Sequence, residues 1–223
     1  MAEFLSREEL RRLDAKAKDI LGIPENILIE NASRGALEVV LGKGISFNKT
    51  AVFAGRGNNS ADSLAFARHI INRGSDVDVF LILDDKPYNP RVEFQLSILK
   101  KILPPEKIKK LHTPKDLEEI ILLDGRTLIV DGIFGIGFIP PLKEFYSRLF
   151  AIINNSKARV LSIDIPSGIS ADEGVLDNPA VKADITVTFL GMKKGFLPEK
   201  SREFLGDVEV KDIGVSYDVL EQL

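Results

Sequence analysis

The chain has 223 residues, of which 44% are hydrophobic and 28% are charged, and its formal net charge is −3. This balance is typical of one soluble α/β domain with a sizeable core, and without a basic run it does not favour nucleic acid as a partner. Because the sequence contains no cysteine, disulfides, thiolate metal sites and cysteine nucleophiles are excluded. We find neither a signal peptide nor a membrane-spanning run, and we therefore expect a cytoplasmic protein.

Two helices are predicted ahead of the first strand. Ser6 and Glu9 have the spacing of a capping box, and the apolar residues that follow them predict a helix that ends near Gly22. Pro24 opens a second helix, whose apolar stripe is formed by Leu28, Ala32, Ala36 and Val39.

From Thr50 onward, apolar strands alternate with helical runs. We expect strands at 50–54, 77–82, 108–111, 127–130, 159–163, 184–189 and 208–210, and helices at 64–71, 90–99, 114–121 and 142–153. Such alternation predicts an α/β fold with a mainly parallel sheet and helices on both of its faces. No repeat or linker interrupts the pattern, so we expect residues 1–223 to form one domain.

The segment Gly55-Arg56-Gly57-Asn58-Asn59-Ser60-Ala61-Asp62 joins the first strand to an amphipathic helical run. A glycine turn between strand and helix presents free backbone N–H groups to an anion, most often a phosphate. The segment is not the dinucleotide fingerprint, because Ser60 stands at the third glycine, and no Gly-Lys-Ser/Thr of a P-loop follows it. Its spacing is equally typical of a tight turn without a ligand and of a ligand-binding loop.

Two further polar loops begin where strands are predicted to end, one at Asp131 and one at Asp164. Because ligands bind at the carboxyl ends of parallel strands, we expect all three loops to line one site. Either aspartate alone is typical of an N-cap or a turn, whereas the two together beside glycines favour a site. The side chains offer oxygen and no sulfur, which suits a hard cation better than zinc or copper.

Over nearly its whole length the sequence resembles the NAD(P)H-hydrate epimerase family, also called the YjeF N-terminal domain. The segments that carry the resemblance are Gly22-Ile23-Pro24 with 28–32, Gly57-Asn58-Asn59 with Asp62, 130–135, 164–168 with Ala171-Asp172 and Gly174, 183–189 with Lys193 and Gly195, and Asp212-Ile213-Gly214. The resemblance implies a Rossmann-like three-layer α/β/α sandwich, commonly a homodimer. It also implies an isomerase that interconverts the R and S epimers of hydrated NADH or NADPH in nicotinamide cofactor repair. A separate ADP- or ATP-dependent dehydratase would then act on one of the two epimers.

The resemblance also implies roles for the residues of the three loops. The ligands of a potassium ion would be Asn59, Asp131 and Ser167. The substrate would contact Asn58, Asn59, Ser60, Ala61 and Asp62, then Gly135, Ile136, Gly137 and Phe138, and finally Asp164. As a hypothesis, Asp164 is the acid/base: the ring hydroxyl leaves as water, a planar iminium remains, and water returns to its other face.

The sequence departs from the family pattern at four positions near this site. Ser60, Ala61 and Ser63 stand where the family usually has glycine, and Ile136 stands where it usually has threonine. A Cβ atom there is costly if the backbone has a positive φ angle. The departures leave open an alternative, a catalytically inactive member that binds a nucleotide-like ligand or a protein partner.

Overall fold

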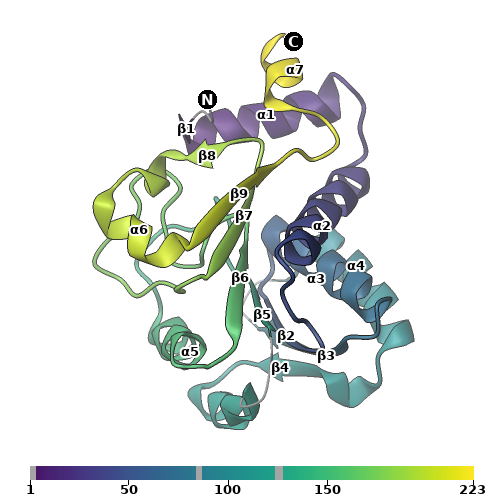
Figure 1. Ribbon diagram of the computed structural model, residues 1–223, viewed down its shortest axis with the longest axis vertical. Coiled ribbons are helices and arrows are strands. Elements are labelled where there is room, and N and C mark those ends of the chain that lie inside the picture. The colour runs from purple at the N-terminus through teal and green to yellow at the C-terminus, as the bar shows by residue number, and fades with distance from the viewer. Residues whose placement is uncertain (1–3, 84–86, 124–127) are drawn as a thin grey trace.

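The computed structural model describes residues 4–83, 87–123 and 128–223, without the side chains of 119 and 121–123. A seven-stranded sheet runs through the molecule in the order β4-β3-β2-β5-β6-β7-β9 (Figure 1). Every neighbouring pair is parallel, which confirms the predicted sheet. The strands are β2 (Lys49–Ala54), β3 (Asp76–Ile82), β4 (Ile108–Leu111), β5 (Leu128–Gly132), β6 (Arg159–Ile163), β7 (Ile185–Phe189) and β9 (Asp207–Lys211).

Helices cover both faces of this sheet and complete the three-layer α/β/α sandwich. The helices are α1 (Arg7–Asp19), α2 (Glu25–Gly42), α3 (Asn58–Ile71), α4 (Pro90–Ile102), α5 (Glu144–Asn154), α6 (Glu199–Leu205) and α7 (Tyr217–Glu221). In Figure 1, α2, α3 and α4 lie on one face, α5 lies on the other, and α7 lies beside α1. No helix in the described parts of the chain is both long and apolar enough to cross a membrane.

Most differences between the predicted and the observed secondary structure concern short elements. β1 (Phe4–Leu5) pairs in parallel with β8 (Met192–Lys193), and neither strand was expected because two residues carry no periodic pattern. The helix expected at 114–121 is a 3-10 helix, Pro114–Leu123. Thr127, placed at the start of a predicted strand, lies outside the described residues. The predicted capping box is confirmed, because Ser6 Oγ accepts from the Glu9 N–H and the Glu9 carboxylate accepts from the Ser6 N–H.

Helix α3 begins earlier than the sequence predicted, inside the segment expected to be a loop. Gly57 is its N-cap and Asn58 its first residue. Ser60, Ala61 and Ser63 are therefore helical, and none of them has a positive φ angle. The backbone strain that would follow from replacing glycine at these positions is absent.

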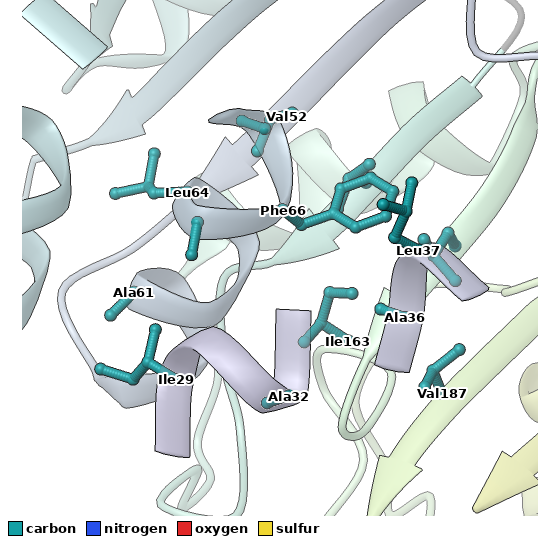
Figure 2. Close-up of a cluster of buried hydrophobic side chains, with 14 of the residues drawn as sticks. Ile29, Ala32, Ala36, Leu37, Val52, Ala61, Leu64, Phe66, Ile163 and Val187 are labelled. Carbon is teal, nitrogen blue, oxygen red and sulfur yellow. The ribbon is translucent and has the colours of Figure 1, made fainter. Parts of the chain in front are cut away.

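The main core lies between the sheet and the layer that contains α2 and α3. Figure 2 shows side chains of both helices meeting those of three strands: Ile29, Ala32, Ala36, Leu37, Ala61, Leu64 and Phe66 from the helices, and Val52, Ile163 and Val187 from the strands. The alanines let the two helices approach closely, and the buried ring of Phe66 points toward Leu37. On the other face Phe53 stacks on Phe80 with ring centroids 4.9 Å apart. The two apolar faces explain why the central strands β2, β3, β5, β6 and β7 are almost entirely buried.

We expect Phe66→Ala to destabilise the fold strongly. The ring is fully buried, so its removal leaves a cavity and costs about 3–5 kcal/mol of unfolding free energy. Phe94→Ala is a matched control, because Phe94 is 46% exposed on α4 and its loss should change stability by less than about 0.5 kcal/mol. Urea unfolding followed by circular dichroism measures both values, and equal losses would contradict this description of the core.

Candidate active site

The strand order reverses between β2 and β5, and a cleft opens at that point. From β2 the chain builds outward to β3 and β4, then returns to β5 and builds the other half of the sheet. Ligands of open parallel sheets bind at such a switch point, outside the carboxyl ends of the strands. The cleft has a volume of about 800 Å³, and the loops after β2, β5 and β6 all contribute to its wall, together with α1 and α2.

Most of the predicted substrate-binding residues line this cleft, and two do not. Those in the wall are Asn58, Asn59, Asp62, Gly135, Ile136, Gly137, Phe138 and Asp164. Ser60 and Ala61 are fully buried behind it, and Ser60 Oγ donates to the Gly132 carbonyl at 2.7 Å. The separation follows from the early start of α3, because helical periodicity places Asn58, Asn59 and Asp62 on one side and the other two on the core side.

The three predicted potassium ligands gather around one backbone segment. Ser167 Oγ donates to Asp131 Oδ1 at 2.5 Å and accepts from the Phe134 N–H at 2.9 Å. Asn59 Nδ2 donates to the Phe134 carbonyl at 2.6 Å. The Asn59 Oδ1 atom is buried and has no hydrogen-bond partner. Asn59 therefore has an unused acceptor oxygen and binds the same Phe134 backbone as Ser167, which in turn binds Asp131.

Asp131 is fully buried, and no cationic side chain of the described residues pairs with it. Burial raises the pKa of this carboxyl, while hydrogen bonds from Ser167, Ser162 and the Ile133 N–H act in the opposite direction. A buried amide oxygen without a partner and a carboxylate without a counter-cation among the described residues fit a hard cation. Within the described residues, no three His, Cys, Asp or Glu side chains form a cluster that could hold a metal.

Asp164 lies directly after β6 in a strained backbone conformation, with a φ angle of 66°. Its N–H donates to the Val187 carbonyl, and its carboxylate Oδ1 lies 2.6 Å from Lys193 Nζ. Lys193 is 1% exposed and also donates to the Phe189 carbonyl at 3.1 Å. The sequence alone assigned no role to Lys193, whose place depends on the pairing of β8 with β1.

The rest of the wall combines an apolar side with a polar rim. On the apolar side Phe134 stacks on Phe138 and contacts Tyr146, with ring centroids 5.1 and 4.7 Å apart. At the rim, Asn58 Oδ1 accepts from Arg91 at 3.0 Å, beside the N-terminus of α3. Sequence reasoning missed Tyr146 and Arg91 as wall residues, because α4 and α5 carry no motif, whereas Phe134 belongs to the second loop that was expected to line the site. The arrangement suits a ligand with flat rings and anionic groups.

Comparison with known proteins identifies relatives over almost the whole chain. The family model described as "YjeF-related protein N-terminus" matches residues 25–195. The chain is 33% identical over 215 residues to the protein named NAD(P)H-hydrate epimerase from Levilactobacillus brevis, which covers 96% of this chain and 95% of that one. It is 37% identical over 213 residues to the bifunctional NAD(P)H-hydrate repair enzyme Nnr from Archaeoglobus fulgidus, covering 96% of this chain and 42% of the relative.

A solved structure agrees with the fold. The crystal structure of yeast ynu0 superposes with a TM-score of 0.74, covers 94% of this chain and 88% of the yeast chain, and is 20% identical in sequence. At this identity the likeness bears on the fold alone. Because the family model spans most of the sequence and the two relatives align over 96% of it, the chain belongs to the family of YjeF-related protein N-termini.

Proposed function

We propose that the protein is an NAD(P)H-hydrate epimerase, an isomerase that interconverts the R and S epimers of hydrated NADH and NADPH in cofactor repair. The name and the near-complete alignment of the L. brevis relative support this activity. The observation in the structure that carries the proposal is the Asp164 carboxylate, held by Lys193 in the wall of a cleft at the switch point.

Epimerisation requires that a hydroxyl leaves one face of the ring and that water returns to the other. Loss of the hydroxyl as water leaves a planar iminium, which water can attack from either face. A positioned carboxyl group accelerates such proton transfers by about 10²–10⁴-fold. The side chain of Asp164 is 15% exposed and lines the cleft, so it can reach a bound ring while most of it stays shielded from solvent.

A potassium ion would be held by Asn59, Asp131 and Ser167. The orphaned Asn59 Oδ1 and the buried charge of Asp131 support this assignment. When bound, potassium supplies positive charge that offsets the Asp131 carboxylate and holds the loops together. The three residues themselves already bind the Phe134 backbone or one another.

The two sides of the cleft suit the two kinds of group in the substrate. The rim at the start of α3, near Arg91, would receive phosphates, because the first N–H groups of a helix and a guanidinium both favour anions. The stacked rings of Phe134 and Phe138 would support an aromatic ring. Asn58, Asp62 and residues 135–138 would contact the substrate from the same wall.

The alternative of an inactive family member loses its main support. Ser60, Ala61 and Ser63 are accommodated in α3 without a positive φ angle, and Ser60 gains a hydrogen bond to the β5 strand end. Ile136 places an apolar side chain in the cleft wall, where a hydroxyl is usual, and leaves Asp164 and Lys193 in place.

Several wider features belong to the same proposal. Residues 1–223 would form one domain, which the pairing of β1 with β8 and the contact of α1 with α7 support. The domain would act as a homodimer in the cytoplasm, and a separate ADP- or ATP-dependent dehydratase would use one of the two epimers. The bifunctional repair enzyme of A. fulgidus supports the link to a second repair activity.

We expect Asp164→Asn to lower kcat by about 10²–10⁴-fold, because the amide cannot accept or return a proton. One pure epimer of hydrated NADPH is mixed with the protein in potassium buffer, and chromatography follows the other epimer against the spontaneous rate. Asp218→Asn is the matched control, since Asp218 is exposed on α7 and far in sequence from the cleft loops. Wild-type turnover by Asp164→Asn would contradict the assigned role.

Potassium should stabilise the fold, and more so at higher pH. Because burial raises the pKa of Asp131, the stability that this residue contributes is lost as pH rises through its folded-state pKa, and a bound cation restores it. At ten times Kd the gain is about 1.4 kcal/mol. Thermal unfolding in potassium chloride is compared with unfolding in tetramethylammonium chloride at pH 5 and pH 8.

Asp131→Asn should remove the potassium effect, and Asn59→Ala provides a second variant that leaves the Asp131 hydrogen bonds intact. If both variants respond to potassium as the wild type does, these residues do not hold the ion. Equal stabilisation by the two chlorides in the wild type would also contradict a specific site.

A further inference from the structure

Asp62 stands apart from the other carboxyl groups of the cleft. Four described residues of the wall carry a carboxyl group. Three of them are each held by a cation: Asp14 by Lys18 at 3.0 Å, Glu25 by Lys18 and Arg91, and Asp164 by Lys193 at 2.6 Å. For Asp62 the described residues provide neither an ion pair nor a hydrogen bond. It is a carboxyl group with no structural partner that faces the substrate space.

The surroundings of Asp62 favour its neutral form. Burial raises its pKa well above the usual range, and the negative charges of Asp164 and Asp14 raise it further. Lys193 lies on Asp164, Lys18 on Asp14 and Arg91 on Glu25, and none of the described cations that line the cleft, Arg11 included, forms an ion pair with Asp62. The 132–138 segment, which forms the neighbouring wall, contains no charged side chain. A neutral carboxyl group in a cleft can donate a proton.

Asp164, unlike Asp62, is paired with a cationic side chain. Its carboxylate lies against the buried ammonium group of Lys193, which is suited to hold a negative charge in place. In this ion pair the carboxylate is suited to accept a proton rather than to donate one. One carboxylate in this state cannot by itself protonate a departing hydroxyl.

Building on the epimerase function proposed above, we propose that Asp62 and Asp164 act as a pair of catalytic carboxyl groups, one for each face of the substrate ring. The pair shares the cleft wall but comes from different layers of the fold, Asp62 from α3 and Asp164 from the end of β6. The two residues thereby divide the acid and base roles that a single Asp164 would otherwise have to combine.

In one direction the Asp62 carboxyl group donates its proton to the ring hydroxyl. The carbon–oxygen bond breaks, water leaves, and the ring nitrogen lone pair forms the C=N bond of the iminium. Water then attacks the opposite face of that carbon, the new carbon–oxygen bond forms as the C=N electron pair returns to nitrogen, and Asp164 takes the proton released by the attacking water. The substrate is inverted, and one proton has moved from Asp62 to Asp164.

The reverse direction uses the two residues in exchanged roles, so the pair must hold one proton between them. After each turnover, solvent returns the proton to Asp62. The charge of Asp164 raises the pKa of Asp62, and carboxyl groups that interact in this way commonly share one proton, because their repulsion opposes double ionisation. The rate should therefore fall on the alkaline side as Asp62 ionises.

The first test is the turnover of Asp62→Asn with one pure epimer of hydrated NADPH in potassium buffer. We expect kcat to fall by about 10²–10⁴-fold while KM changes by a few-fold at most, and Asp62→Glu to recover part of the loss. Asp14→Asn is the matched variant, because it removes a negative charge from the same wall. It should move the alkaline limb of the pH profile to lower pH, because one of the charges that raise the pKa of Asp62 is removed. Turnover by Asp62→Asn within a few-fold of wild type would overturn the pair.

The second test needs no substrate. Carbon-13 NMR of labelled aspartate carboxyl groups, with Asp62→Asn to identify the signal, should show Asp62 titrating well above about 3.9, with and without potassium. Because a raised folded-state pKa makes the wild type lose stability as pH rises toward that pKa, Asp62→Asn should become progressively more stable than wild type over the same range. An ordinary titration of Asp62 would overturn its role as the acid.

The two tests distinguish failure of the proposed epimerase function from failure of the proposed carboxyl pair. An inactive wild type would overturn the epimerase function and the pair with it, whatever the NMR titration shows. An active wild type with an active Asp62→Asn variant would overturn the pair alone and leave the epimerase function standing.

Discussion

The buried carboxylate of Asp131 is the constraint on which the shape of the cleft depends. An ionised carboxyl group inside a protein costs several kcal/mol unless hydrogen bonds or charge compensate it. Here the compensation comes from Ser162 on β6, from Ser167 in the loop that follows it, and from the N–H of Ile133. Because these donors must stay within reach, the loops after β5 and β6 are fixed against each other. Asn59 then adds the start of α3 to the same assembly by its hydrogen bond to Phe134.

The sequence predicts the sheet well because the signals are local. Apolar runs of strand length, separated by helical periods, define all seven strands to within about two residues, and alternation implies their parallel pairing. The start of α3 was missed for a local reason too, since its N-cap is Gly57, which has no side chain to mark it. The pairing of β1 with β8 joins segments almost 190 residues apart, and no property of either dipeptide indicates it.

The residues of the candidate site can likewise be divided into those that the sequence predicts and those that it does not. Asp131 and Asp164 could be predicted because they stand at strand ends and topology brings such ends together. The exclusion of Ser60 from the wall depended on knowing where the helix begins, since a shift of one residue turns a side chain by about 100°. The contacts of Lys193 and Arg91 depend on how far long side chains reach between distant elements, which spacing in the sequence does not encode.

Asp62 and Asp164 differ in their electrostatic surroundings because different layers of the fold supply their neighbours. Lys193 reaches Asp164 from β8, which the N-terminal strand holds in place. Asp62 lies one turn inside α3, where the favourable effect of the helix dipole on a negative charge has largely decayed from its 0.3–1 kcal/mol at the first turn. Burial of an ionised carboxyl group without a partner costs more than this, so desolvation is the main cause of the raised pKa of Asp62. An acid and a base thus arise from the same residue type, through the presence of one buried lysine beside one of them.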